Sequence, residues 1–297
     1  MRIGAVYPQT ELGSDPANLK AFALAIEELG FSHLAIYDHV LGADTTGREP
    51  WNGPYTHHSL FHEVFVAFGY LAGLTARIGL ATSVLVLPQR QTPLVAKQAA
   101  EVDVLSGGRL RLGVGLGWNG VEYAGMGEDF STRGARVEEQ VALLRALWTQ
   151  EVVSFKGRWH TLDRVGINPL PVQQPIPLWF GGGEHPRAVE RIARMADGWF
   201  PPMGFYKPDA SGRESLERFR GLVAENGRDP ADIGIEVRSK LADGQDAALR
   251  ATAFWAGAGA QVTAANTMGM GLRTVDEHIE HLARFRDAAR NALDLES

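Results

Sequence analysis

The sequence predicts an α/β fold, a closed TIM (β/α)8 barrel, and three observations support this prediction. Short apolar segments alternate with stretches of helical periodicity along most of the chain. Strand segments can be placed at eight positions, each with a helix after it, and this order favours a closed parallel barrel over an open sheet. The chain has 297 residues, enough for one barrel of about 250 residues with insertion segments. We therefore expect a single domain over residues 1–297.

Four strand and helix units are expected before residue 150. The first strand is stopped by Pro8, and Pro16 opens the next helix behind Ser14 or Asp15 as its cap. The predicted strands cover residues 2–7, 33–37, 78–86 and 110–114. The predicted helices cover residues 16–29, 62–74, 92–106 and 134–148.

A glycine-rich stretch follows the third of these helices. Gly107 can end that helix in the left-handed conformation, and the next strand alternates apolar residues with Gly113, Gly115 and Gly117. Glycines in a strand allow another group to approach the backbone closely. That group is either a flat ligand ring or the packed interior of the barrel, and the sequence leaves both interpretations open.

The second half of the chain is less regular. Residues 151–175 combine a β-prone stretch with a proline-rich connector, which indicates an insertion between barrel units. Residues 201–232 are expected to be irregular. Strands are predicted at 177–180, 198–200, 233–237 and 260–264, with helices after Pro186, near Asp246 and behind the capping-box pair Thr274 and Glu277.

Composition narrows the classes of function. The net charge is −6 with no long run of Lys or Arg, which argues against nucleic acid and anionic membranes as partners. The chain contains no cysteine, so disulfides and thiolate chemistry are excluded, and redox chemistry would need a bound cofactor. The start of the chain does not resemble a signal peptide, and no apolar run approaches about 18 residues. We expect a cytoplasmic enzyme that acts on a small molecule.

Two groups of residues at predicted strand ends carry candidate chemistry. Asp38 and His39 follow the second strand, where a histidine can donate or accept a proton near neutral pH. They are alternatively a helix cap and a solvent-facing group. The triglycine Gly181, Gly182 and Gly183 lies between a strand and a helix and can present backbone amides to a phosphate. Its alternative is a tight turn, since the Rossmann spacing is absent.

A histidine cluster suggests a metal site at first sight. It consists of His57, His58, His62 and Glu63, with His58 and His62 four residues apart on a predicted helix. A hydrolytic metal barrel would also take ligands from other strand ends, but the first strand ends in Tyr7, Pro8 and Gln9. We therefore favour a partly exposed helix face and expect no metal.

Longer blocks of sequence point to a family. The chain resembles the bacterial luciferase-like monooxygenase superfamily in residues 2 to about 203. It is most similar to the branch of actinobacterial oxidoreductases that depend on the deazaflavin coenzyme F420. The blocks that carry the resemblance are TSVLVLPQRQTPLVAKQAAEVDVLSGGRLRLGVGLGWNGVEYAGMG, RGARVEEQVALLRALW, VSFKGRWHTLDRVGINPLPVQQPIPLWFGG and MADGWFPP.

The resemblance implies a luciferase-like barrel that holds a reduced flavin or deazaflavin over its strand ends, usually in a homodimer. Asp38 and His39 match an Asp-His pair beside the reactive ring edge, where the histidine is the proposed acid or base. Ser83 and Val84 match a bulge with a non-proline cis peptide against the ring. The remaining matches are Gly117 and Trp118 in the loop over the pocket, and Gly181, Gly182 and Gly183 near the phosphate-bearing tail.

Departures from the related deazaflavin-linked glucose-6-phosphate dehydrogenases bear on the substrate. Trp118 and Thr10 stand where those enzymes carry acidic residues, and Phe205 stands where they carry a phosphate-binding lysine. The resemblance therefore argues against sugar-phosphate oxidation. Trp118, Trp199, Phe200 and Phe205 suggest an apolar or aromatic substrate, or packing at the barrel mouth.

The leading hypothesis is hydride transfer between F420 and a small organic substrate, with His39 supplying or steering the proton. The first alternative is a two-component monooxygenase that uses reduced FMN and O2. The second alternative is a non-catalytic flavin-binding protein, and the last is a metal-dependent hydrolase.

Overall fold

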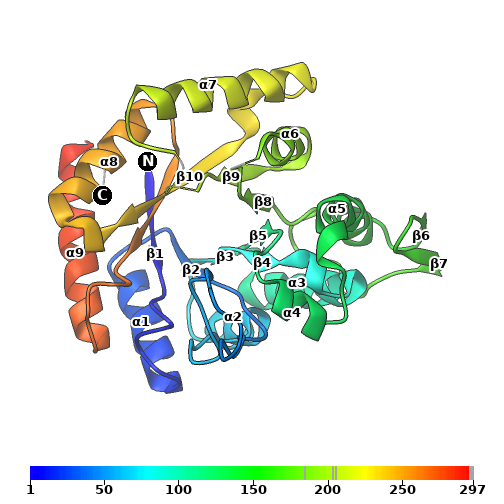
Figure 1. The fold of residues 1–297 in the computed structure, drawn as a ribbon, viewed down its shortest axis with the longest axis horizontal. Coiled ribbons are helices and arrows are strands. Elements are labelled where there is room, and N and C mark those ends of the chain that lie inside the picture. Colours follow the sequence, from blue (N-terminus) through cyan, green and yellow to red (C-terminus); the bar gives the residue numbers. More distant parts are fainter. Residues whose placement is uncertain (184, 203, 205, 294–297) are drawn as a thin grey trace.

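A closed ring of parallel strands forms the centre of the molecule (Figure 1), seen in a computed structural model that describes residues 1–183, 185–202, 204 and 206–293. The strands of the ring are β1 (Arg2–Val6), β2 (His33–Ile36), β3 (Gly79–Thr82), β4 (Leu85–Val86), β5 (Leu110–Gly115), β8 (Leu178–Gly181), β9 (Gly198–Phe200), β10 (Gly234–Lys240) and β11 (Val262–Asn266). They pair in the order β3, β2, β1, β11, β10, β9, β8, β5, and pairing of β3 with β5 closes the ring. With β3 and β4 as one interrupted strand, the described residues form the predicted eight-stranded barrel.

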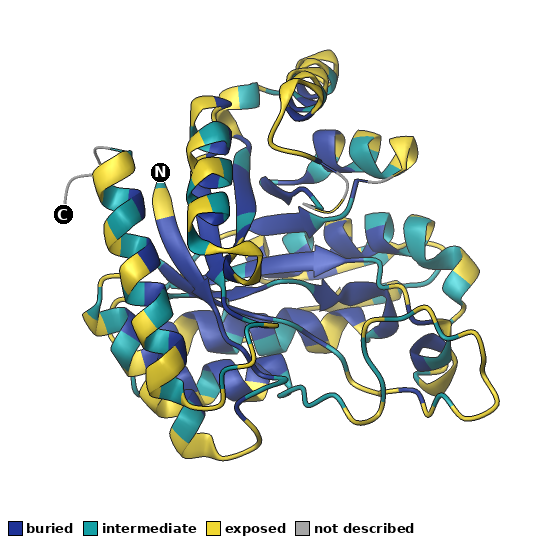
Figure 2. Cartoon of the chain, turned by 60° about the vertical axis from the view of Figure 1, so that its left-hand side comes forward, coloured by how far each residue is buried: buried dark blue, intermediate teal, exposed yellow. Residues whose placement is uncertain are grey.

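Helices surround the ring and turn their buried residues toward it (Figure 2). They are α1 (Pro16–Glu28), α2 (Val64–Ala72), α3 (Thr92–Ser106), α4 (Gly120–Gly125), α5 (Arg133–Thr149), α6 (Pro186–Met195), α7 (Ala210–Glu225), α8 (Gln245–Gly257) and α9 (Val275–Ala292). Short 3-10 turns cover Leu87–Gln89, Phe130–Thr132, Pro230–Asp232 and Leu241–Asp243.

Local capping signals set several helix ends. Asp15 caps α1 by accepting a hydrogen bond from the amide of Ala17. Gly107 ends α3 with a φ of 67°, the left-handed conformation that glycine adopts without a steric penalty. The capping box of Thr274 and Glu277 at the start of α9 is present. These predictions are confirmed.

The prediction of one continuous strand over residues 78–86 is wrong, because two short strands occupy this segment. β3 ends at Thr82 and β4 begins at Leu85, and the peptide bond between Ser83 and Val84 is cis, as the resemblance implies. β3 pairs with both β2 and β5, whereas among the described strands β4 pairs with β5 alone. The apolar run in the sequence therefore hides a break at the end of the strand.

The predicted helix over residues 62–74 begins later than expected. Glu63 is the N-cap of α2, because its carboxylate accepts a hydrogen bond from the amide of Val66. His58 and His62 therefore lie in the loop before the helix, and their expected helical spacing is wrong.

The two segments expected to interrupt the barrel differ from each other. Residues 151–175 contain an antiparallel hairpin, β6 (Val153–Lys156) and β7 (Thr161–Val165), which lies beside α5 at the edge of the molecule (Figure 1). Residues 201–232 are not irregular throughout, because the 16-residue helix α7 occupies their centre. Leu216, Phe219 and Val223 of α7 are buried, but many charged residues on its other faces obscure this spacing. Met203 and Phe205 lie outside the described residues.

Charged residues fill part of the barrel interior. Glu236 of β10 reaches across the ring to His33 of β2, with 3.2 Å between Oε2 and Nε2, and it pairs with Arg111 of β5. Burial would raise the pKa of the Glu236 carboxyl, but Arg111 and the other nearby cationic groups hold it well below its usual range. The mouth of the barrel therefore lies above an ionised, paired layer.

No helix among the described residues has both the length and the apolar character needed to cross a lipid bilayer.

Candidate active site

The carboxyl ends of the strands bring several predicted residues around one cavity. This glycine-lined cavity has a volume of about 600 Å³ and lies between β4, β5, β8 and the start of α6. It is lined by Val84, Gly115, Leu116, Gly117, Trp118, Phe130, Arg133, Phe180, Gly181, Gly182, Gly183, His185, Ala188, Arg191 and Ile192. This cavity is therefore lined by six of the predicted site residues, namely Val84, Gly117, Trp118 and the triglycine.

The glycines make room for the protein's own side chains. A methyl group at Gly115 would lie 2.5 Å from Cγ2 of Val84, and one at Gly181 would lie 2.8 Å from Cγ1 of the same valine. At Gly113 it would lie 2.1 Å from the carbonyl oxygen of Thr82. Of the two open interpretations of these glycines, close packing of the barrel accounts for Gly113, whereas Gly115 and Gly181 also form the cavity wall beside Val84.

The triglycine adopts a backbone that requires glycine. Gly182 and Gly183 have φ values of 121° and 128°, which other residues rarely adopt. Their carbonyl oxygens accept hydrogen bonds from Nε1 of Trp199 at 2.6 Å and from the hydroxyl of Tyr206 at 2.8 Å. Trp199 is fully buried, so it supports this turn by packing and does not line the cavity.

Asp38 follows β2, does not line the cavity, and is engaged within the protein. Its Oδ1 accepts from the Arg90 guanidinium at 2.7 Å, and its Oδ2 accepts from the amide of Val86 at 3.0 Å. Burial raises the pKa of the Asp38 carboxyl, while Arg90 and the Val86 amide act in the opposite direction. Through Val86, Asp38 ties the end of β2 to β4 and to the adjacent Ser83–Val84 bulge.

His39 forms a hydrogen-bonded pair with Glu122 of α4. The ring Nδ1 lies 2.8 Å from Oε2 of Glu122, and Oε1 of the same carboxylate accepts from the amides of Val40 at 2.6 Å and Leu41 at 3.2 Å. Burial would raise the pKa of Glu122, but the hydrogen bonds from His39 and the two amides lower it below its ordinary value. Glu122 is therefore a buried, ionised partner of the imidazole.

Sequence reasoning missed Glu122 for a specific reason. Asn119 and Glu122 have the spacing of a capping box, in which the glutamate would turn back to the helix start. Asn119 does cap α4 by accepting from the amides of Val121 and Glu122. The Glu122 side chain instead turns to His39, which is 83 residues away in sequence.

Aromatic rings enclose the other side of His39. The ring centroids of Tyr55, Phe61 and Trp118 lie 5.4, 4.9 and 5.7 Å from that of His39. Trp118 also meets Trp51 at 5.8 Å and remains 37% exposed. The histidine thus lies between a carboxylate and an aromatic wall that reaches the glycine-lined cavity.

Two arginines of the cavity were also missed by sequence reasoning. Arg133 stacks over the ring of Phe130, with Cζ 3.6 Å from the ring centroid, and Arg191 pairs with Glu138 at 2.9 Å. Arg133 begins α5 and Arg191 lies on α6, so the start of one helix and the cationic side chains of both meet at the cavity. No local motif marks these residues, because only the fold brings them together.

The histidine cluster has no metal-site geometry. Glu63 is committed to the α2 cap and to Arg90, and His57 contacts the carbonyl oxygen of Ala43 at 3.3 Å. Across the described ranges, no group of three or more histidine or acidic side chains is arranged to hold a metal ion.

Comparisons with known proteins give one consistent family. Residues 1–296 match the family described as luciferase-like monooxygenase. An uncharacterized protein of Mycobacterium tuberculosis is 34% identical over 219 residues, which cover 72% of this chain and 74% of that protein. The F420-dependent glucose-6-phosphate dehydrogenase of Nakamurella multipartita is 32% identical over 248 residues, covering 81% of this chain and 68% of that enzyme.

Solved structures share the fold. The F420-dependent tetrahydromethanopterin reductase of Methanopyrus kandleri superposes with a TM-score of 0.73 at 14% identity, covering 95% of this chain and 97% of that one. An F420-dependent secondary alcohol dehydrogenase superposes with a TM-score of 0.71 at 19% identity, covering 97% and 99%. Monooxygenase RslO1 of Streptomyces bottropensis gives 0.67 at 22% identity, covering 99% and 88%.

Proposed function

This chain belongs to the luciferase-like monooxygenase family, and from that membership we propose that it is an oxidoreductase that transfers a hydride between the deazaflavin coenzyme F420 and a small organic substrate. Relatives that use F420 support the choice of coenzyme. The observation that carries the proposal is the glycine-lined cavity, whose lining residue Trp118 packs against His39, a histidine held by a buried carboxylate.

The residues of the cavity fit a planar coenzyme with an anionic tail. Apolar side chains such as Leu116 and Phe180 line the space beside Val84, where we propose that the ring system binds against Ser83, Val84, Gly117 and Trp118. Among the described residues, Nε of Arg133 is buried without a hydrogen-bond partner. Arg133 and Arg191, together with the backbone of Gly181, Gly182 and Gly183, are proposed to hold the charged tail.

His39 is the proposed acid or base. When bound, the reduced coenzyme supplies the hydride, which the protein's own side chains cannot provide. With Nδ1 engaged by Glu122, His39 has Nε2 available to donate or accept the proton that accompanies the transfer. The carboxylate of Glu122 fixes the orientation of the His39 ring.

We assign Asp38 a supporting role within the site. Both of its oxygens are engaged by Arg90 and the Val86 amide, so it contributes to coenzyme binding by holding β4 and the Ser83–Val84 bulge in position. The aromatic wall of Tyr55, Phe61 and Trp118 favours an apolar or aromatic substrate.

A homodimer is part of the proposal. The neighbouring helices α2 and α3 leave Val66 and Leu94 at 71% and 53% exposure, and Tyr70 and Leu105 are exposed as well. Apolar side chains exposed together on one surface are typical of an interface. Light scattering at micromolar concentration is expected to give twice the mass of the 32.3 kDa chain.

An FMN-dependent monooxygenase is the second candidate, because the family that matches the chain is described as luciferase-like monooxygenase. The two candidates differ in their use of oxygen. Reduced F420 should be oxidised without oxygen when a suitable acceptor with an electron-poor C=C or C=N bond is present. Oxygen consumption with reduced FMN, together with no anaerobic oxidation of reduced F420, would favour the alternative. Binding of either coenzyme with no turnover on any acceptor would indicate a flavin-binding protein without catalysis.

A further inference from the structure

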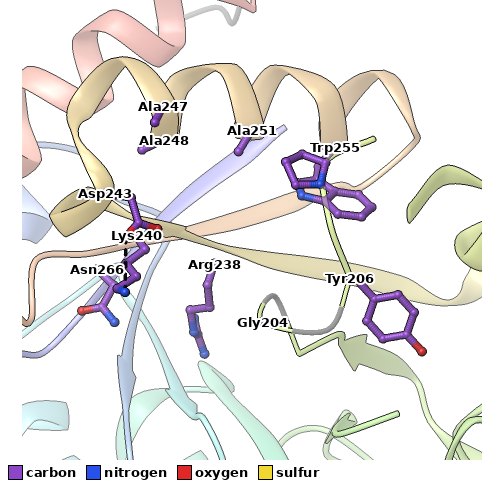
Figure 3. A pocket seen from close by; sticks show the side chains of 11 residues that line it. Gly204, Tyr206, Arg238, Lys240, Asp243, Ala247, Ala248, Ala251, Trp255 and Asn266 are labelled. Carbon is purple, nitrogen blue, oxygen red and sulfur yellow. Dashed lines mark ion pairs between the residues drawn. The ribbon is translucent and has the colours of Figure 1, made fainter. Parts of the chain in front are cut away.

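We propose that a second cavity at the barrel mouth binds an anionic group of the substrate, so that the substrate is an organic acid with an apolar body. This inference rests on the proposed function and names its substrate class. The second cavity has a volume of about 400 Å³ and lies between β10, β11 and α8 (Figure 3). Its polar wall is formed by Arg238, Lys240 and Asn266, and its apolar wall by Ala248, Ala251 and Trp255.

The base of the second cavity carries surplus positive charge. Nη1 of Arg238 donates to Oε1 of Glu236 at 2.8 Å, and the same carboxylate also pairs with Arg111. Two guanidinium groups therefore share one carboxylate. The third partner of Glu236 is His33, and burial lowers the pKa of its imidazole. The neutral form of His33 is therefore favoured, and the positive charge to be balanced comes from the two guanidinium groups. A ligand anion would balance the remaining charge.

Lys240 provides a cation at the rim of the cavity. Its Nζ lies 3.3 Å from Oδ1 of Asp243, and both side chains are about 60% exposed. An ion pair this exposed contributes little to stability, so the ammonium can exchange Asp243 for a ligand carboxylate at small cost. Asp243 thus competes with the proposed ligand.

The second cavity is connected to the candidate active site through aromatic side chains. The Tyr37 ring lies against Arg238, whose Cζ is 5.8 Å from the centroid of the ring. The Tyr37 hydroxyl accepts a hydrogen bond from Nδ2 of Asn266 at 3.2 Å. Tyr37 directly precedes Asp38 and His39 in sequence.

Phe200 provides a second connection. Its ring centroid lies 5.6 Å from Cζ of Arg238, and it belongs to the apolar cluster against which Val84 packs. An anion held by Lys240 would therefore place an apolar body over Tyr37 and Phe200, between the two cavities.

The test uses the full chain without coenzyme, so that its outcome does not depend on the proposed coenzyme. Isothermal titration at pH 7 compares phenylacetate, its neutral analogue phenylacetamide, and inorganic phosphate. Lys240→Met removes the rim cation, and Asp243→Asn removes its competitor. Lys20→Met, an exposed lysine on α1, is the matched control.

We expect phenylacetate to bind at least about tenfold more tightly than phenylacetamide, as for a charge-assisted hydrogen bond. Lys240→Met should abolish most of that preference, Lys20→Met should preserve it, and Asp243→Asn should strengthen phenylacetate binding, a gain that misfolding cannot imitate. Tighter binding of phosphate with the same response to the variants would support the subsite and identify a phosphate as the anion. Equal binding of the acid and the amide, or a preference that survives Lys240→Met, would overturn the proposal whether or not F420 binds.

Discussion

Nδ1 of His39 lies 2.8 Å from Oε2 of Glu122, although the two residues follow different strands of the barrel. The carboxylate is fully buried and also accepts hydrogen bonds from the two amides that follow His39. This arrangement fixes the backbone and the ring of the histidine together. It gives the imidazole one orientation, between the Glu122 carboxylate and Trp118, which lines the cavity.

Replacement of His39 by alanine should reduce kcat by roughly 10²- to 10⁴-fold, the usual contribution of a positioned acid or base. The affinity for F420 should change by less than about threefold, because the proposed binding contacts come from other residues. Fluorescence titration measures the affinity, and anaerobic oxidation of reduced F420 measures kcat. His58→Ala, which alters an exposed loop histidine, should behave as wild type. An unchanged kcat in His39→Ala would remove the assignment.

Glu122→Gln tests a positioning residue. The amide retains the shape of the side chain but cannot balance a charged imidazole, so kcat should fall about tenfold or more with a smaller change in KM. Glu28→Gln, on the exposed face of α1, is the control. A loss of stability with an unchanged kcat would show that Glu122 is only structural.

Much of the barrel was predictable because its signals are local. Pro16 behind Asp15 and the pair Thr274 and Glu277 mark helix starts within a few residues, and both predictions are confirmed. The break between Thr82 and Leu85 was not visible from apolar periodicity, because both sides of the break are apolar. Helix α7 was missed because its few buried positions are separated by charged residues.

The site was predictable only in part. Val84, Gly117, Trp118 and the triglycine do meet at one cavity. Asp38 and His39 do not line that cavity. Their hydrogen-bond partners come from distant segments of the chain: Glu122 for His39 and Arg90 for Asp38. Pairings of this kind depend on the closed ring, and no spacing in the sequence specifies them.

Arg191→Met should weaken F420 binding about tenfold, because it removes a cation from the cavity wall. Arg194→Met is a matched control, since both arginines pair with Glu138 but only Arg191 lines the cavity. Equilibrium titration of both variants provides the comparison. Equal losses in the two variants would contradict the placement of the coenzyme tail.

Gly115→Ala should destabilise the protein by about 1–3 kcal/mol, because the added methyl group overlaps Val84. The shifted Val84 side chain should also reduce coenzyme affinity. Gly120→Ala is the control. Apart from its chain neighbours and the backbone of its own helix, no atom of the described residues lies within 4 Å of the new methyl group. Urea unfolding and coenzyme titration check the two effects. Equal stability of both variants would contradict the packing described here.

Burial lowers the pKa of His278 to about 4, and this predicts acid-dependent stability. The unfolded histidine titrates near about 6.5, so its contribution to stability is complete above that pH and is lost as the pH falls toward 4. The loss should be at most about 3 kcal/mol. Urea unfolding between pH 7.5 and about 4.5 should show a shallower dependence for His278→Asn than for wild type or His58→Asn. Identical slopes would contradict the burial of this imidazole.

The coenzyme site is tested most directly by parallel titration of the purified chain with F420 and with FMN, in which quenching of tryptophan fluorescence reports binding. Trp118 lines the glycine-lined cavity, so a ring system bound there should quench its emission. We expect saturable quenching by F420, with tighter binding than FMN and with most of the quenching lost in Trp118→Phe. Absence of saturable binding of either coenzyme, or quenching that does not depend on Trp118, would contradict it.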